Sequence, residues 1–192
     1  MTTTVFYLDG ITSPSTLKKF AFKGRSGVLP PASAGNLTGE AEFSDANYAA
    51  SLSDDASFVE YTDSGADYAG IRISFQLNNV DPSLASSITV NVRAVANNGY
   101  SGGGWNLYIK NLGTNSWESL ATYFVDALTT LSGTKNSSLT NYINNQGQVQ
   151  ALALGNNPMD GNGSGAYIKL SFANISCDYT DTPFPTVTPQ II

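Results

Sequence analysis

The chain has 192 residues with a formal net charge of −6; 41% of the residues are hydrophobic and only 12% are charged. This length and apolar content fit one domain with a real core, and an acidic balance without a broad basic face excludes nucleic acid as a partner. Because the chain contains no histidine, it cannot build a Ser-His-Asp or Cys-His catalytic site, or a zinc site that uses histidine.

The first part of the chain holds one strand followed by a long irregular stretch. A strand is expected at residues 5–8. Residues 10–36 are interrupted by prolines and glycines, which predicts an extended arm or a long loop. A further short strand is expected at residues 37–43.

From residue 67 onward, hydrophobic and polar residues alternate with the period of two that is typical of half-buried strands. In residues 71–77, for example, Ile71, Ile73 and Phe75 share one face. A phase shift in the last segment predicts a bulge near Ala173. The further expected strands lie at residues 88–94, 105–110, 120–131, 148–154 and 166–172, and after the bulge the last segment continues with opposite parity to Tyr179.

The pattern as a whole gives about eight or nine strands, and no long segment has helical periodicity. We therefore predict an all-β fold, a two-sheet antiparallel β-sandwich of the jelly-roll type. A Pro-rich tail follows, because proline cannot occupy a central strand. The predicted parts are an N-terminal strand and extended arm (1–36), the jelly-roll domain (37–180) and the C-terminal tail (181–192).

The arm and the tail are the expected assembly contacts. The arm carries a basic stretch, and an acidic stretch follows it between Glu40 and Asp67. The charges are either simply solvated, or the arm docks on an acidic surface of the same or a neighbouring subunit. The tail docks either on its own domain or on a partner. The candidate assembly residues are Lys18, Lys19, Lys23 and Arg25 in the arm and Phe184, Ile191 and Ile192 in the tail.

Residues 40–176 resemble the galactose-binding-domain-like jelly rolls, a group that includes many carbohydrate-binding modules. The segments Ala46-Asn-Tyr-Ala-Ala-Ser-Leu-Ser-Asp-Asp and Trp105-Asn-Leu-Tyr-Ile-Lys-Asn carry the resemblance, together with the strand and turn patterns at residues 88–92, 114–118, 141–143, 147–149 and 167–170. The resemblance implies the fold, glycan binding on loops at one edge and a structural calcium ion. Residues outside it look like the extensions by which bacteriophage and other virion jelly rolls lock onto neighbours.

Acidic residues supply the candidate metal site. Calcium requires six to eight oxygen ligands, and the best sources are Asp54, Asp55 and Asp160. The Asp160-Gly-Asn-Gly-Ser-Gly segment lacks the closing Glu of an EF-hand, so an ordinary flexible turn is the alternative. No other cofactor is expected. Cys177, the only cysteine, lies in a strand pattern that predicts a buried, unreactive thiol.

Aromatic residues supply the candidate glycan site, for which we select Tyr100, Tyr108, Trp117 and Tyr142. The alternation of residues 105–110 directs Trp105 inward and Tyr108 outward. Three roles stay open for these side chains: core packing, a platform on which sugar rings stack, and a subunit interface.

Taken alone, the sequence favours a non-enzymatic structural or accessory protein of a virion, such as a phage decoration, fibre or adaptor protein, which assembles into a homo-oligomer or larger particle. The single cysteine and the lack of a signal-peptide pattern after Met1 support this interpretation. The alternative is a stand-alone carbohydrate-binding or adhesion module, extracellular or on a cell surface. A third possibility is a glycosidase that uses two carboxylates. No membrane partner is expected, because no segment has about 18 consecutive apolar residues.

Overall fold

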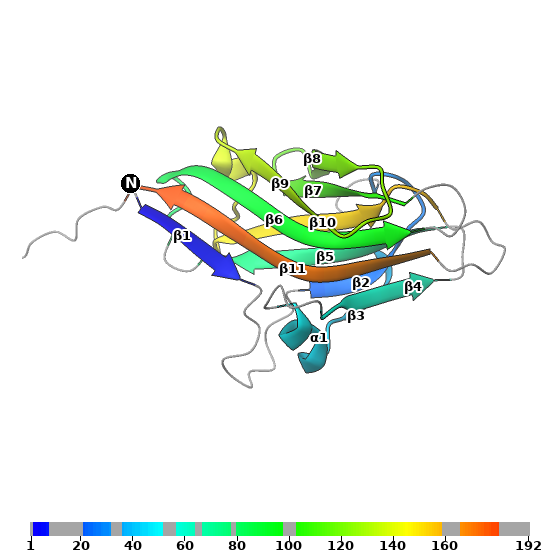
Figure 1. Cartoon of the computed structure of the whole chain (residues 1–192). Helices are drawn as coiled ribbons and strands as arrows, with labels where there is room; N and C mark the ends of the chain where they lie inside the picture. The colour runs from blue at the N-terminus through cyan, green and yellow to red at the C-terminus, as the bar shows by residue number, and fades with distance from the viewer. Residues whose placement is uncertain are drawn as a thin grey trace, which may run out of the picture.

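The described part of the chain folds into two antiparallel β-sheets that face each other in a sandwich (Figure 1). The computed structural model describes residues 2–7, 21–31, 36–51, 57–63, 67–77, 80–97, 103–158 and 166–180. These residues contain eleven strands, one α-helix and one 3-10 helix. The predicted all-β antiparallel sandwich is therefore confirmed.

Five strands form one sheet and six form the other. The five-stranded sheet has the order β1-β11-β6-β9, with β4 also paired to β11. Its strands are β1 (Thr2–Tyr7), β4 (Val59–Asp63), β6 (Ala85–Asn97), β9 (Thr129–Lys135) and β11 (Ala166–Tyr179). The six-stranded sheet consists, in spatial order, of β3 (Thr38–Glu42), β2 (Ala21–Ser26), β5 (Tyr68–Gln76), β10 (Gln148–Gly155), β7 (Trp105–Asn111) and β8 (Ser116–Tyr123).

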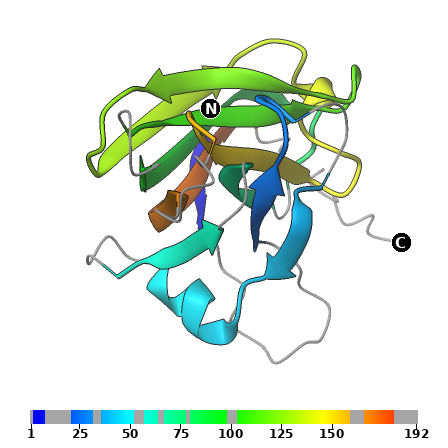
Figure 2. The same cartoon turned by 90° about the vertical axis from the view of Figure 1, so that its right-hand side faces the viewer.

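The strands from β4 to β11 form a jelly roll. They pair first with last and so on inward: β4 with β11, β5 with β10, β6 with β9, and β7 with β8. This nested antiparallel pairing is the defining topology of the fold. β1 adds to β11, while β2 and β3 extend the six-stranded sheet beyond β5. Figure 2 shows β2 (dark blue) next to β3 (light blue), with α1 below them.

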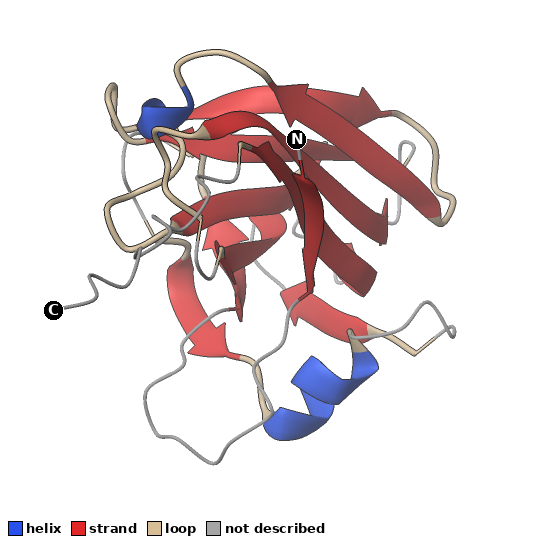
Figure 3. Cartoon of the chain, turned by 90° about the vertical axis from the view of Figure 1, so that its left-hand side faces the viewer, coloured by secondary structure: helices blue, strands red, loops and turns tan. Residues whose placement is uncertain are grey.

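The helix α1 (Asp45–Ala50) is short but well capped (Figure 3). The side chain of Ser44 accepts a hydrogen bond from the backbone of Asn47, whose side chain accepts one from the backbone of Ser44. This capping box satisfies donors that the first helical turn leaves free. Tyr48, on the buried face of the helix, accepts a hydrogen bond at its Oη atom from the backbone N–H of Ala21 at 2.9 Å. The helix is thereby tied to the first residue of β2.

The core lies between the sheets and is built from the inward side chains of both. Ile71, Ile73 and Trp105 are completely buried in it, as the alternation of their strands predicts. Cys177 is also completely buried, and desolvation raises the pKa of its thiol to about 11. The predicted burial of this thiol is confirmed.

Two sequence predictions about the strands are wrong. Residues 21–26, expected within the arm, form β2 and pair with β5. The single strand expected at residues 120–131 is two strands, β8 and β9, that lie in different sheets. A run of β-forming residues does not mark where a chain crosses from one sheet to the other, and here the turn after Tyr123 makes that crossing.

The bulge expected in β11 exists, but it lies earlier in the strand. The register of β11 against β6 shifts between Leu170 and Phe172, which leaves the buried Ser171 as the extra residue. Phe172 therefore does not share the inward face of Leu170, and Ala173 returns to the core. Among the described residues, no helix is long and apolar enough to cross a membrane.

Candidate functional site

The outer face of the six-stranded sheet, turned away from the core, buries an unusual set of side chains. Strand register places Arg72 of β5 beside Leu152 of β10, and Leu152 beside Tyr108 of β7. The next row pairs Lys110 of β7 with Trp117 of β8. Large aromatic and charged side chains from four adjacent strands thus meet on one face.

A small apolar cluster, separate from the main core, occupies this face. We call it the outer cluster; it consists of Leu37, Tyr108, Trp117, Leu152 and Leu154. Tyr108 is 5% exposed and Trp117 is 6% exposed. Desolvation, with a smaller contribution from Tyr68, raises the pKa of Tyr108 to about 12.

Two facing glycines make room for Leu37, a member of the outer cluster. Gly24 of β2 pairs with Gly70 of β5. A Cβ atom on Gly24 would lie 2.9 Å from the Cβ of Leu37, and one on Gly70 would lie 2.8 Å from the Cδ1 of Leu154. These distances are shorter than real Cβ contacts. Because Gly24 and Gly70 have no side chains, Leu37 can pack directly on the sheet.

Arg72 forms a buried ion pair beside the cluster. Its Nε and Nη2 atoms donate to the two carboxylate oxygens of Glu40, each at 2.7 Å. The Arg72 guanidinium also lies 4.3 Å from the centre of the Phe22 ring. The backbone N–H of Leu37 donates to the same carboxylate at 2.7 Å. Both oxygens of Glu40 are therefore occupied, and the charge of Arg72 is matched.

Lys110 lies on the same face and has no such match. Its side chain is buried, yet its Nζ atom has no hydrogen-bond partner among the described residues. It lies 5.3 Å from the centre of the Trp117 ring, and the Nε1 atom of Trp117 is likewise buried without a partner. Desolvation lowers the pKa of Lys110. Trp105 is the third residue with such an atom, but it faces the core.

Tyr142 belongs to a different environment, at the edge where the two sheets meet. Glu118 of β8 accepts hydrogen bonds there from Lys135 of β9 at 2.6 Å, from Tyr142 at 2.8 Å and from Asn111 at 2.5 Å. These bonds, with that from Lys135 the largest, lower the pKa of Glu118 to about 2. The 3-10 helix Leu139–Asn141 positions Tyr142 for this contact. The arrangement ties β8 to β9 and serves the fold.

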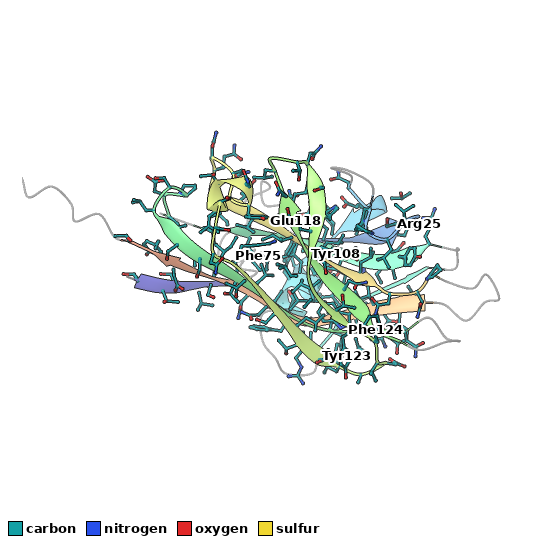
Figure 4. All side chains as sticks on the ribbon, turned by 90° about the horizontal axis from the view of Figure 1, so that it is seen from above. Arg25, Phe75, Tyr108, Glu118, Tyr123 and Phe124 are labelled. Atoms are coloured by element: carbon teal, nitrogen blue, oxygen red, sulfur yellow. The ribbon has the colours of Figure 1, made fainter. Side chains whose placement is uncertain are left out.

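The structure brings together two of the four candidate glycan residues. Tyr108 and Trp117 share the outer cluster, Tyr142 lies in the edge arrangement, and Tyr100 lies outside the described residues. Among the described residues the most exposed large hydrophobic side chain is instead that of Phe124, in the turn after β8, with 76% of its surface accessible. Figure 4 shows Phe124 beside Tyr123, away from Glu118.

The two described basic residues of the predicted arm, Lys23 and Arg25, contact their own chain. Arg25 pairs with Asp67 at 3.2 Å, and Lys23 donates to the carbonyl oxygen of Glu60 at 3.3 Å. Both partners belong to the acidic stretch. The assembly residues Lys18, Lys19, Phe184, Ile191 and Ile192 lie outside the described residues, so their role stays a prediction.

The candidate calcium ligands Asp54, Asp55 and Asp160 also lie outside the described residues. Within the described ranges, no group of three or more His, Cys, Asp or Glu side chains is placed to hold a metal ion.

The sequence prediction did not include Lys110, although a signal for it was present. Lys110 has the same strand parity as Tyr108, so the alternation that turned Tyr108 outward also turned Lys110 outward. The sequence analysis selected Trp117 as a glycan-site residue, but it could not place Trp117 beside Lys110, because that pairing depends on the register of β7 with β8.

Fold and site together define a jelly-roll β-sandwich with a closed aromatic and cationic cluster on one outer face. Residues 17–179 match the family model AF_1625_C, described as "Uncharacterized protein, C-terminal domain", and the chain belongs to this family. No curated protein matches the chain.

Several solved structures have a similar architecture at low sequence identity. A xylan-binding module of family CBM15 is 11% identical over 92% of this chain and 97% of its own, with a TM-score of 0.45. A mutant of a family 29 carbohydrate-binding module, CBM29-2, is 10% identical over 96% and 99%, with a TM-score of 0.35. The CBM22-1 xylan-binding domain of Paenibacillus barcinonensis Xyn10C is 11% identical over 66% and 85%, with a TM-score of 0.34.

Proposed function

We propose that the chain is a non-enzymatic carbohydrate-binding module whose site is the outer face of the six-stranded sheet. The observation that carries the proposal is that Tyr108 and Trp117 lie together in the outer cluster. Sugar rings present flat C–H surfaces edged by hydroxyl groups. Tyr and Trp side chains match them because each combines a flat apolar face with a polar tip.

Polar side chains lie on the same outer face of the sheet as the two aromatic rings. Asn106 precedes Tyr108 on β7 with the same parity, and Thr122 of β8 donates to its Oδ1 atom at 2.6 Å. Ser74 and Gln150 pair across β5 and β10 in the row that contains Lys110 and Trp117. Amides and hydroxyls both donate and accept, which suits saccharide hydroxyl groups.

A saccharide can reach the aromatic rings of the outer cluster only if neighbouring side chains move. Leu37 belongs to the outer cluster, and Leu29 packs against it. Both residues come from the connection between β2 and β3. Since Tyr108 and Trp117 are nearly inaccessible, binding is coupled to a shift of these two leucine side chains.

The carboxylates near the site favour binding over hydrolysis. Glycosidases need one carboxyl group as an acid and a second as a nucleophile or base. Glu40 is held on both oxygens by Arg72, and Glu118 is held by Lys135 at the sandwich edge. Both are committed to ion pairs, so neither is suited to act as the acid or the nucleophile.

The test is affinity electrophoresis and calorimetry against a panel of soluble plant, bacterial and algal polysaccharides. Trp117→Ala should weaken binding at least tenfold, while Phe124→Ala, which removes an exposed aromatic ring far from the outer cluster, should leave it unchanged. Thermal unfolding of each variant controls for folding. If Phe124→Ala abolishes binding and Trp117→Ala does not, the site lies on the loops instead. If no saccharide binds the unmodified chain, the proposed function is wrong.

A further inference from the structure

Resting on the proposed function, we infer that the saccharide is acidic: an anionic oxygen group of the sugar, carboxylate or sulfate, binds the ammonium of Lys110 and the indole N–H of Trp117. The inference concerns the class of ligand, which neither the fold nor the aromatic pair specifies.

Two buried cations on this face differ in their surroundings. Within the described ranges, Arg72 and Lys110 are the buried basic residues. Arg72 donates from its Nε and Nη2 atoms to the two oxygens of one carboxylate and has an aromatic ring beside it. Lys110 has, among the described residues, an aromatic ring beside it, that of Trp117, and no acceptor for its ammonium group. A buried ammonium costs far more than a ring contact returns unless an anion or acceptor joins it.

The buried donor atoms without hydrogen-bond partners indicate the chemistry of the ligand. An ammonium group offers three donors and no acceptor, and an indole offers one donor. The Nζ atom of Lys110 and the Nε1 atom of Trp117 therefore both require acceptors from their partner. A neutral hydroxyl group would satisfy one donor while adding a donor of its own. A carboxylate or sulfate group supplies several acceptor lone pairs and no donor, and it forms the stronger charge-assisted bonds.

The charge around Lys110 does not explain why this lysine is buried. The chain is acidic as a whole, with a net charge of −6, so it has no general attraction for anions. Glu40, an acid on this face, is neutralised by Arg72. An anion would thus be selected by one local, water-excluded cation. Such a pair is screened by salt much less than a surface contact is.

The experiment uses matched ligands and matched variants of the full chain. The ligands are a glucuronic-acid oligosaccharide, the same oligosaccharide after reduction of its carboxyl groups, and an oligosaccharide of neutral sugars that carries sulfate groups as its only charges. The variants are Lys110→Met, Lys110→Arg and Lys169→Met. Lys169 is the control because it also lies over an aromatic ring, that of Tyr167 at 4.7 Å, but on the other sheet. Affinities are measured by calorimetry in 0.05 M and 0.3 M salt.

We expect the unmodified chain to bind one acidic ligand roughly ten- to a hundredfold more tightly than the reduced one, with little loss at 0.3 M salt. Lys110→Met should abolish this preference and keep the weaker binding of the reduced ligand, whereas Lys110→Arg and Lys169→Met should retain the preference. Whether uronate or sulfate binds better identifies the anion.

Equal binding of acidic and reduced ligands, or an unchanged preference in Lys110→Met, would overturn the inference and leave the proposed function standing. Binding of no ligand by the unmodified chain would overturn both. Circular dichroism spectra and thermal unfolding of Lys110→Met separate a lost preference from a lost fold.

Discussion

Lys110 and Trp117 face each other across neighbouring strands, with the Lys110 Nζ atom 5.3 Å from the centre of the Trp117 ring. The ring compensates part of the hydration that the ammonium loses on burial. It leaves the N–H groups of both side chains without acceptors in the part of the chain that the structure describes. Residues that weaken a fold without an evident structural benefit are a feature of binding sites, where function is retained at the expense of stability.

We therefore expect Lys110→Met to stabilise the protein. The substitution removes a buried, unpaired ammonium and keeps an unbranched apolar stem of similar length, so the free energy of unfolding should rise by about 1–2 kcal/mol. Urea denaturation at neutral pH measures the change, with Lys169→Met as the surface control, for which a change within about 1 kcal/mol is expected. A clear loss of stability in Lys110→Met would indicate that the lysine serves the fold.

Arg72 should behave in the opposite way. Arg72→Met leaves the carboxylate of Glu40 buried and unpaired, and we expect the free energy of unfolding to fall by about 3–5 kcal/mol. The double variant Arg72→Met with Glu40→Leu removes both charges and should recover more than half of that loss. Denaturant titrations of the two single variants and the double variant give the coupling energy. Strictly additive losses would show that the ion pair contributes nothing.

Leu37→Ala tests whether the Leu37 side chain limits the access of a ligand to the outer cluster. Shortening Leu37, which is 5% exposed, should cost about 2–3 kcal/mol of stability. The open state should become more populated, so affinity for a saccharide should rise severalfold. Acrylamide quenching of Trp117 fluorescence in a Trp105→Phe background reports the same opening without a ligand. Unchanged quenching together with unchanged affinity would rule out this role for Leu37.

The edge arrangement around Glu118 predicts sensitivity to acid. Its pKa is lowered from 4.5 to about 2 on folding, chiefly by the hydrogen bond from Lys135. Because the pKa is lower in the folded state, the ionised carboxylate stabilises the fold at pH values above the unfolded-state pKa. That stabilisation is lost as the pH falls from about 4.5 toward 2. Because the side chain is 32% exposed, we expect a contribution of about 1–2 kcal/mol.

Glu118→Gln should therefore be less stable than the unmodified chain at pH 6 and nearly equal to it at pH 2. Denaturant unfolding at a series of pH values measures the difference between the two proteins. A difference that stays constant over this range would mean that the ionisation of Glu118 does not stabilise the fold.

Alternation determined much of the fold from sequence. It located β5, β6, β7 and β10, because each strand has one face toward the core and the period of two is a direct consequence of that burial. It also turned Trp105 inward and Tyr108 outward. It could not locate β2, whose six residues contain Gly24 and two basic residues, or separate β8 from β9, which share a run of β-forming residues.

The composition and periodicity of this sequence determined an acidic, histidine-free, two-sheet antiparallel sandwich with Tyr108 on its outward side, because those properties follow from local residue chemistry. Only the tertiary structure decided that Trp117 lies against Lys110, that Glu40 neutralises Arg72 and that Leu37 packs on the outer face over a pair of glycines. These contacts join residues through strand register and through a connection that folds back on the sheet. Neither is encoded in the pattern of any single strand.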